Sequence, residues 1–170
     1  MEKSSYLPLL PLMVQGHRFA FTLTEVERLL PLAEVQWLPQ MPPFIIGLVT
    51  IEEEPVVMID FAGRLGLEMH REYTIEQPVI LLCSGERRGA VVVDEVSVVE
   101  TIKEHQVRGA ELFRSRQTPV KGMVNLRAGP TLLMDAAQLI AVDLEPELAP
   151  LTLGEDLRAI CSPAAEDPPS

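Results

Sequence analysis

Two stretches of this chain resemble each other at a constant separation, and this internal repeat limits the possible folds more than any other feature. Residues 47–60 read GLVTIEEEPVVMID, and residues 122–135 read GMVNLRAGPTLLMD. The matching residues, beginning with Gly47 and Gly122, are 75 positions apart, and 14 positions align without a gap. A gapless match of this length predicts that the chain contains two related structural units.

A second, looser match precedes each copy. Residues 13–29 resemble residues 82–99 once one residue is inserted, and Val26 and Val96 then occupy equivalent places. Both segments contain an apolar run, a turn of glycine and charged residues, and another apolar run, which is the pattern of a hairpin. The chain is therefore predicted to form two related lobes, each built from two hairpins, that are either interleaved or consecutive.

Most of the chain has the pattern of short strands. Runs rich in Val, Ile and Leu recur between glycines, prolines and charged turns, which indicates small β-barrels or a sandwich. Residues 47–51 and 56–59 are expected to be two such strands, with Glu52, Glu53 and Glu54 at the tip of their hairpin. At that tip the glutamates are either a solvated turn or a contact surface.

Short helices are expected after two aspartates. Asp60 and Asp135 precede residues 61–65 and 136–140, and each aspartate is well placed to be an N-cap. Gln138 follows Asp135 by three positions, as in a capping box.

Three further segments complete the predicted secondary structure. Thr24 and Glu27 have capping-box spacing, but the repeat aligns them with an extended segment, so residues 22–30 are predicted to form a short helical turn followed by a strand. Residues 104–119 carry few apolar side chains and are predicted to be a long loop. A third helix is expected at about residues 153–160.

The composition excludes several classes of function. Lys and Arg number 14 against 25 Asp and Glu, which gives a net charge of −11. Such a surface repels nucleic acids and anionic membranes, so neither is an expected partner. No apolar run approaches the ~18 residues of a membrane helix, and the N-terminus lacks the features of a signal peptide. Cys83 and Cys161 form no disulfide framework, and we expect a cytoplasmic protein in a reducing compartment.

The side chains that could support catalysis or bind a metal form no motif. His17, His70 and His105 are scattered in turns or loops without ligand spacing, and we expect them to be solvated. Asp60 and Asp135 could be imagined as a carboxylate pair, but capping explains both positions better. The sequence therefore predicts that the protein is not an enzyme and uses no cofactor or metal.

Two long segments, PPFIIGLVTIEEEPVVMIDFAGRLGL and VILLCSGERRGAVVVDEVSVVETI, resemble the CheW-like domain, the adaptor of bacterial chemosensory arrays. The resemblance extends from about Tyr6 to Ile140 and covers both repeats. Its most specific marks are Pro43, Ile46 and Gly47, the run PVVMID, and the run RRGAVVVDEV with Gly89 and Asp94.

This resemblance implies a mainly β fold of two SH3-like five-stranded β-barrel lobes that share a hydrophobic core, with short helices. It also implies a task without catalysis. A CheW-like protein couples methyl-accepting chemoreceptors to the regulatory domain of a CheA-type histidine kinase, which has the same two-lobed fold. The resemblance implies that lobe docks on lobe through apolar strand edges and that the receptor's helical tip lies in a groove between lobes.

The resemblance also assigns residues to two surfaces. The expected kinase contacts are Val26, Arg28, Val56 and Met58. The expected receptor contacts are Gly47, Ile51, Glu52, Val79 and Ile80. Each apolar member could equally be a core residue, because an alternating strand places half of its side chains inside.

The glutamate turn departs from the family pattern. The family usually has Asn-Leu-Arg-Gly where this chain has Thr50-Ile51-Glu52-Glu53, whereas an Asn-Leu-Arg run occurs in the second copy at residues 125–127. A carboxylate thus replaces the arginine that engages the receptor. The lost glycine would have adopted a positive φ at little cost. The departure predicts a divergent or accessory adaptor with weakened receptor binding.

The expected organisation is a CheW-like domain over residues 6–145, a C-terminal extension with a short helix over residues 146–162, and a disordered tail over residues 163–170. The alternative function is a small-ligand-binding barrel, or an enzyme, that uses the groove between the lobes. That alternative requires several polar groups to converge on a pocket.

Overall fold

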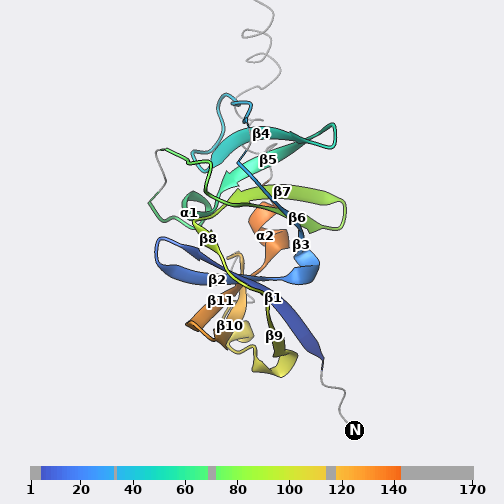
Figure 1. Ribbon diagram of the computed structural model, residues 1–170, viewed down its shortest axis with the longest axis vertical. Coiled ribbons are helices and arrows are strands. Elements are labelled where there is room, and N and C mark those ends of the chain that lie inside the picture. Colours follow the sequence, from blue (N-terminus) through green and yellow to red (C-terminus); the bar gives the residue numbers. More distant parts are fainter. Residues whose placement is uncertain (1–4, 33, 69–71, 114–117, 143–170) are drawn as a thin grey trace, which may run out of the picture.

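The computed structural model describes residues 5–32, 34–68, 72–113 and 118–142. These residues form two stacked β-lobes with two short helices between them (Figure 1). The lower lobe in Figure 1, which we call the lower barrel, contains β1 (Tyr6–Val14), β2 (His17–Thr22), β8 (Glu95–Val96), β9 (Glu100–Lys103), β10 (Val120–Leu126) and β11 (Gly129–Met134). The upper barrel contains β3 (Val26–Leu30), β4 (Ile45–Ile51), β5 (Glu54–Asp60), β6 (Val79–Ser84) and β7 (Arg87–Val92), and the helices are α1 (Phe61–Arg64) and α2 (Ala136–Ile140).

The two lobes are interleaved along the chain. The lower barrel has the strand order β10-β11-β2-β1-β8, with β9 also paired to β1, and the upper barrel has the order β3-β6-β7-β5-β4. In each barrel one hairpin from each half of the chain joins the other through a parallel pair, β11 with β2 and β5 with β7. The predicted repeat of hairpins is therefore confirmed, and the interleaved alternative is the one observed.

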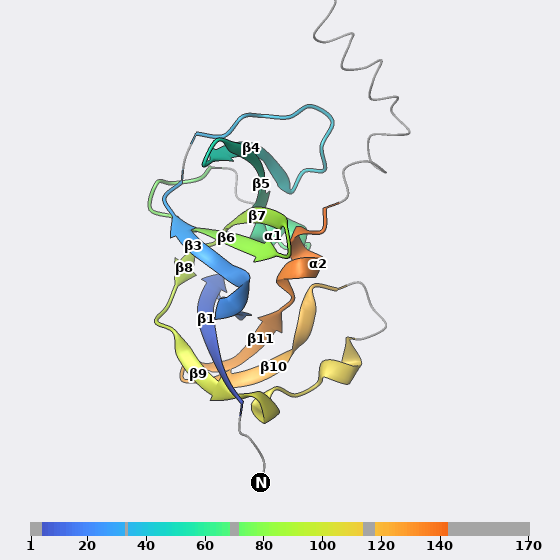
Figure 2. The same ribbon diagram turned by 90° about the vertical axis from the view of Figure 1, so that its right-hand side faces the viewer.

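Two isolated bridges connect the ends of the sheets. After β3, Gln36 pairs with Leu48 of β4, and after β9, Arg108 pairs with Met123 of β10. The chain that leaves one edge strand thus returns to the opposite edge, and the turned view shows it passing over the open side of each sheet (Figure 2). The prediction of two small barrels is confirmed, and the lower sheet has six strands where five were expected because both β8 and β9 pair with β1.

Alternating side chains divide the core into three parts. Along β6, Val79 and Leu81 point into the upper barrel, whereas Ile80 and Leu82 point into a central cluster between the lobes. The lower barrel has its own interior, formed by Leu9, Ala20, Ile102, Val124, Leu126 and Leu133. Strands such as β6 are buried on both faces, which explains their unbroken apolar sequence. The shared hydrophobic core is thus an interface that both lobes need.

Both aspartates cap the helices that follow them, as predicted. Asp60 Oδ1 accepts a hydrogen bond from the backbone N–H of Gly63, and Asp135 Oδ1 accepts one from Gln138, each at 3.2 Å. The predicted capping box at Gln138 is only half formed. Its second hydrogen bond would run from the backbone N–H of Asp135 to the Gln138 side chain, but this N–H donates to the carbonyl oxygen of Pro119 at 2.7 Å. The helices begin where the sequence places them, and α1 is one residue shorter than expected.

The structure refines several local predictions. Residues 22–30 form a 3₁₀ turn, Leu23–Glu25, followed by β3, as expected. Thr24 and Glu27 do not form a capping box at this turn. The loop 104–119 contains the 3₁₀ turns Glu104–Gln106 and Ala110–Leu112 among its described residues. The predicted helix at 153–160, the extension at 146–162, the tail at 163–170 and His70 lie outside the described residues.

Gly47 and Gly122 are repeat-related positions at which the crossing segments approach an edge strand. A Cβ atom on Gly47 would collide with the carbonyl oxygen of Gln36, and one on Gly122 would lie 2.8 Å from the carbonyl oxygen of Arg108. Gly47 also has φ of 154°, which only glycine adopts easily. The bridges of both barrels therefore depend on a missing side chain.

Replacing Gly47 with alanine should lower the free energy of unfolding by roughly 1–3 kcal/mol, because the backbone conformation and the contact with Gln36 both become strained. Chemical denaturation would measure the loss. Gly66→Ala is a matched control, since Gly66 has φ of 79° with no heavy atom within 4 Å of the added Cβ. It should cost only about 1 kcal/mol. Equal losses would show that the crossing segment simply moves aside.

Candidate functional site

The glutamate turn is tighter than the sequence suggests. Ile51 pairs with Glu54, so Glu52 and Glu53 alone form the turn and Glu54 already belongs to β5. Glu52 has φ of 52° and Glu53 has φ of 68°. These are the positive angles of the two-residue turns that suit the twist of a hairpin, and glycine or asparagine usually occupies them. The turn therefore holds two non-glycine residues in a conformation that costs energy.

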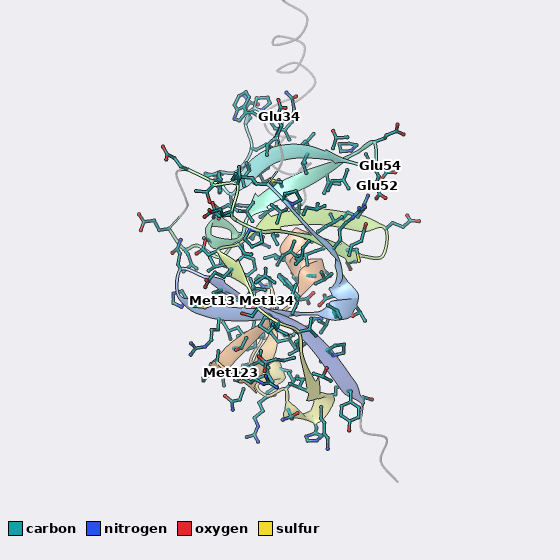
Figure 3. All side chains as sticks on the ribbon, in the orientation of Figure 1. Met13, Glu34, Glu52, Glu54, Met123 and Met134 are labelled. Carbon is teal, nitrogen blue, oxygen red and sulfur yellow. The ribbon has the colours of Figure 1, made fainter. Side chains whose placement is uncertain are left out.

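Two arginines from neighbouring strands neutralise this turn. Arg28 on β3 and Arg88 on β7 each direct Nη2 at Oε1 of Glu52, at 2.7 Å and 2.9 Å. Arg88 also forms a bidentate pair with Glu27, at 3.1 Å and 2.6 Å. Its Nη1 lies 3.8 Å from Oε2 of Glu54. We call these five residues the charge cluster, and Figure 3 shows two of them, Glu52 and Glu54, at the β4–β5 turn.

The charge cluster shifts the ionisation of its members. Hydrogen bonds from Arg88 and Arg28 hold the pKa of Glu52 below its ordinary value of 4.5. The Glu27 and Glu52 carboxylates raise the pKa of Arg88 above its ordinary value. The side chains of Glu52 and Arg28 remain 61% and 42% exposed, so a partner can reach them while they are paired.

The predicted kinase contacts fall into two groups. Arg28 is exposed and Val26 is half-buried on β3. Val56 and Met58 are 3% and 1% exposed and pack in the interior of the upper barrel. A partner on the closed barrel cannot touch the last two side chains directly, so they stabilise β5 behind the surface that Arg28 presents.

The predicted receptor contacts divide in the same way. Ile51, Val79 and Ile80 are buried, and Gly47 is covered by the segment that carries Gln36. Glu52 is the exposed member. The structure brings it against Arg28, so the two surfaces predicted as separate meet at one ion pair.

Glu27 and Arg88 also belong to this site, although no contact role was predicted for them, and so does Glu54, for which a contact surface was one of the two alternatives. Their sequence surroundings are ordinary charged turns and strand ends, and only the order β3-β6-β7-β5-β4 places them side by side. The parallel pair of β5 with β7 is the decisive step, because it sets Val57 opposite Gly89 and so brings Arg88 near the β4–β5 turn.

Of the remaining polar candidates, Asp60 has a structural role. Asp60 is fully buried, caps α1 and accepts a hydrogen bond from the Tyr73 hydroxyl at 2.7 Å. Burial, together with this carboxylate, raises the pKa of Tyr73. His17 and His105 are exposed. In the described ranges, no group of three or more His, Cys, Asp or Glu side chains could hold a metal ion.

A hollow of about 450 Å³ lies between the lobes, away from the charge cluster. It is lined by Arg64 at the end of α1, by Leu67 just after this helix, and by residues of β2, β10 and β11. The predicted receptor residues do not contribute to it, so the expected groove and the expected receptor contacts are at different places.

The depressed pKa of Glu52 predicts how stability depends on pH. Its ion pairs stabilise the fold fully above the ordinary pKa and are lost as pH falls through the lowered value. The drop in melting temperature between about pH 7 and about pH 3 should therefore be smaller for Glu52→Gln than for wild type. Glu53→Gln is the control, because no ion pair of Glu53 is found among the described residues. Equal drops in all three proteins would contradict the prediction.

Replacing Glu53 with glycine should raise the free energy of unfolding by about 0.5–1 kcal/mol. Relief of a left-handed conformation is worth about 1–2 kcal/mol, and the greater freedom of glycine in the unfolded chain returns about 0.4–1 kcal/mol of it. Denaturant titration would measure the change. Thr50→Gly, at an exposed and extended position of β4, should instead destabilise the protein. A loss of stability in Glu53→Gly would mean that the turn carries no strain.

Comparison with known proteins agrees with this architecture. The CheW-like domain family matches residues 8–143. The chemotaxis protein CheW of Bacillus subtilis (strain 168) is 26% identical over 108 residues, which cover 64% of this chain and 69% of that protein. The crystal structure of scaffolding protein TtCheW from Thermoanaerobacter tengcongensis has the same fold, with a TM-score of 0.72 at 16% identity over 82% of this chain and 95% of that one. In the described part of this chain, no helix has the length and apolar character needed to span a membrane. The chain belongs to the CheW-like domain family.

Proposed function

We propose that this protein is a non-enzymatic chemosensory adaptor that couples chemoreceptors to a CheA-type histidine kinase through protein–protein contacts. The family match over residues 8–143 is the observation that carries this proposal. In this proposal the protein is cytoplasmic and is recruited to membrane-associated receptor arrays. It acts by holding two partners at defined positions, which requires a rigid scaffold and exposed contact residues.

We assign the kinase contact to the exposed side of β3. Arg28 is the positively charged group of β3, and Leu29, the next residue along the strand, is 48% exposed. An arginine next to an apolar side chain is typical of the residues that dominate protein interfaces. Val26 extends this surface, while Val56 and Met58 support it from inside the barrel.

We assign the receptor contact to the turn that carries Glu52. The ion pairs support the idea of a divergent member in a specific way. A receptor tip that approaches this turn meets a carboxylate already satisfied by Arg28 and Arg88, and it must break those pairs before it can use either arginine. A receptor site adapted to an arginine from the adaptor would face the Glu52 carboxylate instead. That carboxylate would either meet a group of the same charge or remain unpaired. Receptor binding should therefore be weak.

Binding titrations with a CheA-type regulatory domain and with a chemoreceptor signalling fragment would test both assignments. Arg28→Glu should weaken kinase binding by about tenfold or more, because it reverses a charge inside the contact. Arg87→Glu, an exposed residue at the start of β7 outside the charge cluster, should leave it unchanged. Unchanged binding in Arg28→Glu, or an equal loss in the control, would refute the kinase assignment.

The receptor assignment is tested with variants of the Glu52–Glu53 turn. Glu52→Arg with Glu53→Gly should strengthen binding of the receptor fragment several-fold and leave kinase binding no tighter. Glu52→Gln with Glu53→Gly makes the same change in turn geometry without the new positive charge, so it separates the two causes. If wild type already binds the fragment tightly and neither variant alters this, the protein is an ordinary rather than a divergent coupling member.

One observation favours a second candidate function, small-ligand binding. The hollow between the lobes is of ligand size, and a few polar groups, including Arg64 and Thr118, lie among apolar residues in its lining. It is separate from the charge cluster, and both functions can exist in one molecule.

A further inference from the structure

Two adjoining hollows form one groove on the side of the molecule opposite the charge cluster. The larger, of about 450 Å³, lies between the lobes, and the smaller, of about 280 Å³, continues along the lower barrel. They share His17, Phe19 and Leu132, so their walls are continuous. In Figure 1, α1 and the β1–β2 turn lie on one side and the β4–β5 turn on the other. We call this feature the inter-lobe groove.

The groove has an apolar wall. Its lining includes Phe19, Leu65, Leu67, Val120 and Leu132, contributed by β2, β10, β11 and the segment after α1. Phe19 packs edge-on against Phe61 with 4.9 Å between ring centroids, so this wall is an extension of the central core. A volume of this size is within the range of about 300–1,000 Å³ that small-molecule sites occupy.

The polar groups of the groove are positive or neutral. Arg18, His17 and Arg64 line it, and neither hollow has an Asp or Glu in its described lining. This is unusual in a chain with a net charge of −11. The local surface thus favours an anion over a cation.

Arg64 is held rigidly at the groove. Its Nη2 and Nε donate to the carbonyl oxygens of Gln138 and Leu139 at 3.1 Å and 3.3 Å, and its guanidinium lies 5.7 Å from the centre of the Phe44 ring. Burial lowers the pKa of Arg64, and among the described residues no carboxylate pairs with it. A partly desolvated cation without a counter-ion gains more from a bound anion than a solvated one.

Thr118 supplies an unused hydrogen-bonding group. Its hydroxyl oxygen is buried in the lining of the larger hollow and has no hydrogen-bond partner among the described residues. Such a group costs free energy unless it is satisfied. The oxygen is covered in this conformation, and rotation of the side chain about χ1 would bring it to a ligand oxygen in the groove.

We propose that the inter-lobe groove binds a small amphipathic carboxylate, with its aliphatic part against Phe19, Leu67 and Leu132 and its carboxylate near Arg64, His17 and the Thr118 hydroxyl. A purely hydrophilic anion would leave the apolar wall exposed to water, and an amphipathic amine would meet only positive and neutral groups. This inference rests on the small-ligand binding proposed above, for which it names the ligand class, and it does not depend on the adaptor function.

Decanoate, used below its micelle concentration, is a suitable probe. It should raise the melting temperature of the full-length protein, and in amide NMR spectra the resonances of β2 and β11 should shift more than those of β4 and β5. Decylamine and decanol are the matched cationic and neutral probes and should bind more weakly. Raising the salt concentration should weaken decanoate binding, because part of the attraction is ionic.

Two variants test the placement. His17→Glu puts a carboxylate in both hollows and should weaken decanoate binding by about fivefold or more, whereas Thr118→Val should weaken it by about threefold through the lost hydrogen bond. Arg87→Glu is the control, because Arg87 begins the second strand of the other hairpin as His17 does in the first and lies outside the groove. Binding of the CheA-type regulatory domain should be the same in all three variants.

The proposal fails if decanoate and decylamine bind equally, if amide shifts are spread over exposed apolar residues of both lobes, or if His17→Glu binds decanoate as wild type does. Normal decanoate binding without any kinase binding would refute the adaptor function and leave this inference intact. The reverse result would refute only the inference.

Discussion

The packing of both lobes on one central cluster is the constraint on which the rest of the structure depends. Phe61, at the start of α1, packs edge-on against Phe19 and Phe21 of the lower barrel. The chain crosses between the lobes twice, before β3 and again after β7. The lower barrel therefore combines strands from both ends of the described chain, and the upper barrel is formed by the strands between the two crossings. Glu25 fixes the first crossing, since its carboxylate accepts hydrogen bonds from the Ala136 N–H at 3.0 Å and from the Lys121 ammonium at 2.9 Å. Neither barrel is therefore an independent unit.

What the sequence predicts well is local. Hairpins follow from apolar runs between turns, and the caps at Asp60 and Asp135 follow from residue type and position. The charge cluster could not be predicted, because it joins Arg28, Glu52 and Arg88 across strands whose order no local pattern reveals. The contact residues that the family resemblance implies include both exposed and buried side chains, for a related reason. Strands buried on both faces lack the alternation that would have marked residues such as Val79 and Ile80 as internal.

The ion pair between Arg28 and Glu52 gives the adaptor proposal a physical consequence. Each residue is assigned to a different partner, yet each is the other's counter-ion at 2.7 Å. A partner that takes Arg28 into its own interface leaves Glu52 dependent on Arg88 alone and changes the charge that the second partner meets. The two binding events are then coupled through a direct contact, and by linkage the coupling acts equally in both directions.

The two barrels use the same hairpin in different ways. In the lower barrel the turn Arg127-Ala128 precedes Gly129, which takes a φ of 128° at no cost from a side chain. In the upper barrel the equivalent turn has no glycine, and Arg28 and Arg88 pair with Glu52, one of its two strained glutamates. A turn whose conformation is stabilised by exposed charges, rather than by glycine, responds to pH, to salt and to any molecule that competes for those arginines. That responsiveness would be a defect in a purely structural turn, and it suits the contact surface between two partners that we propose.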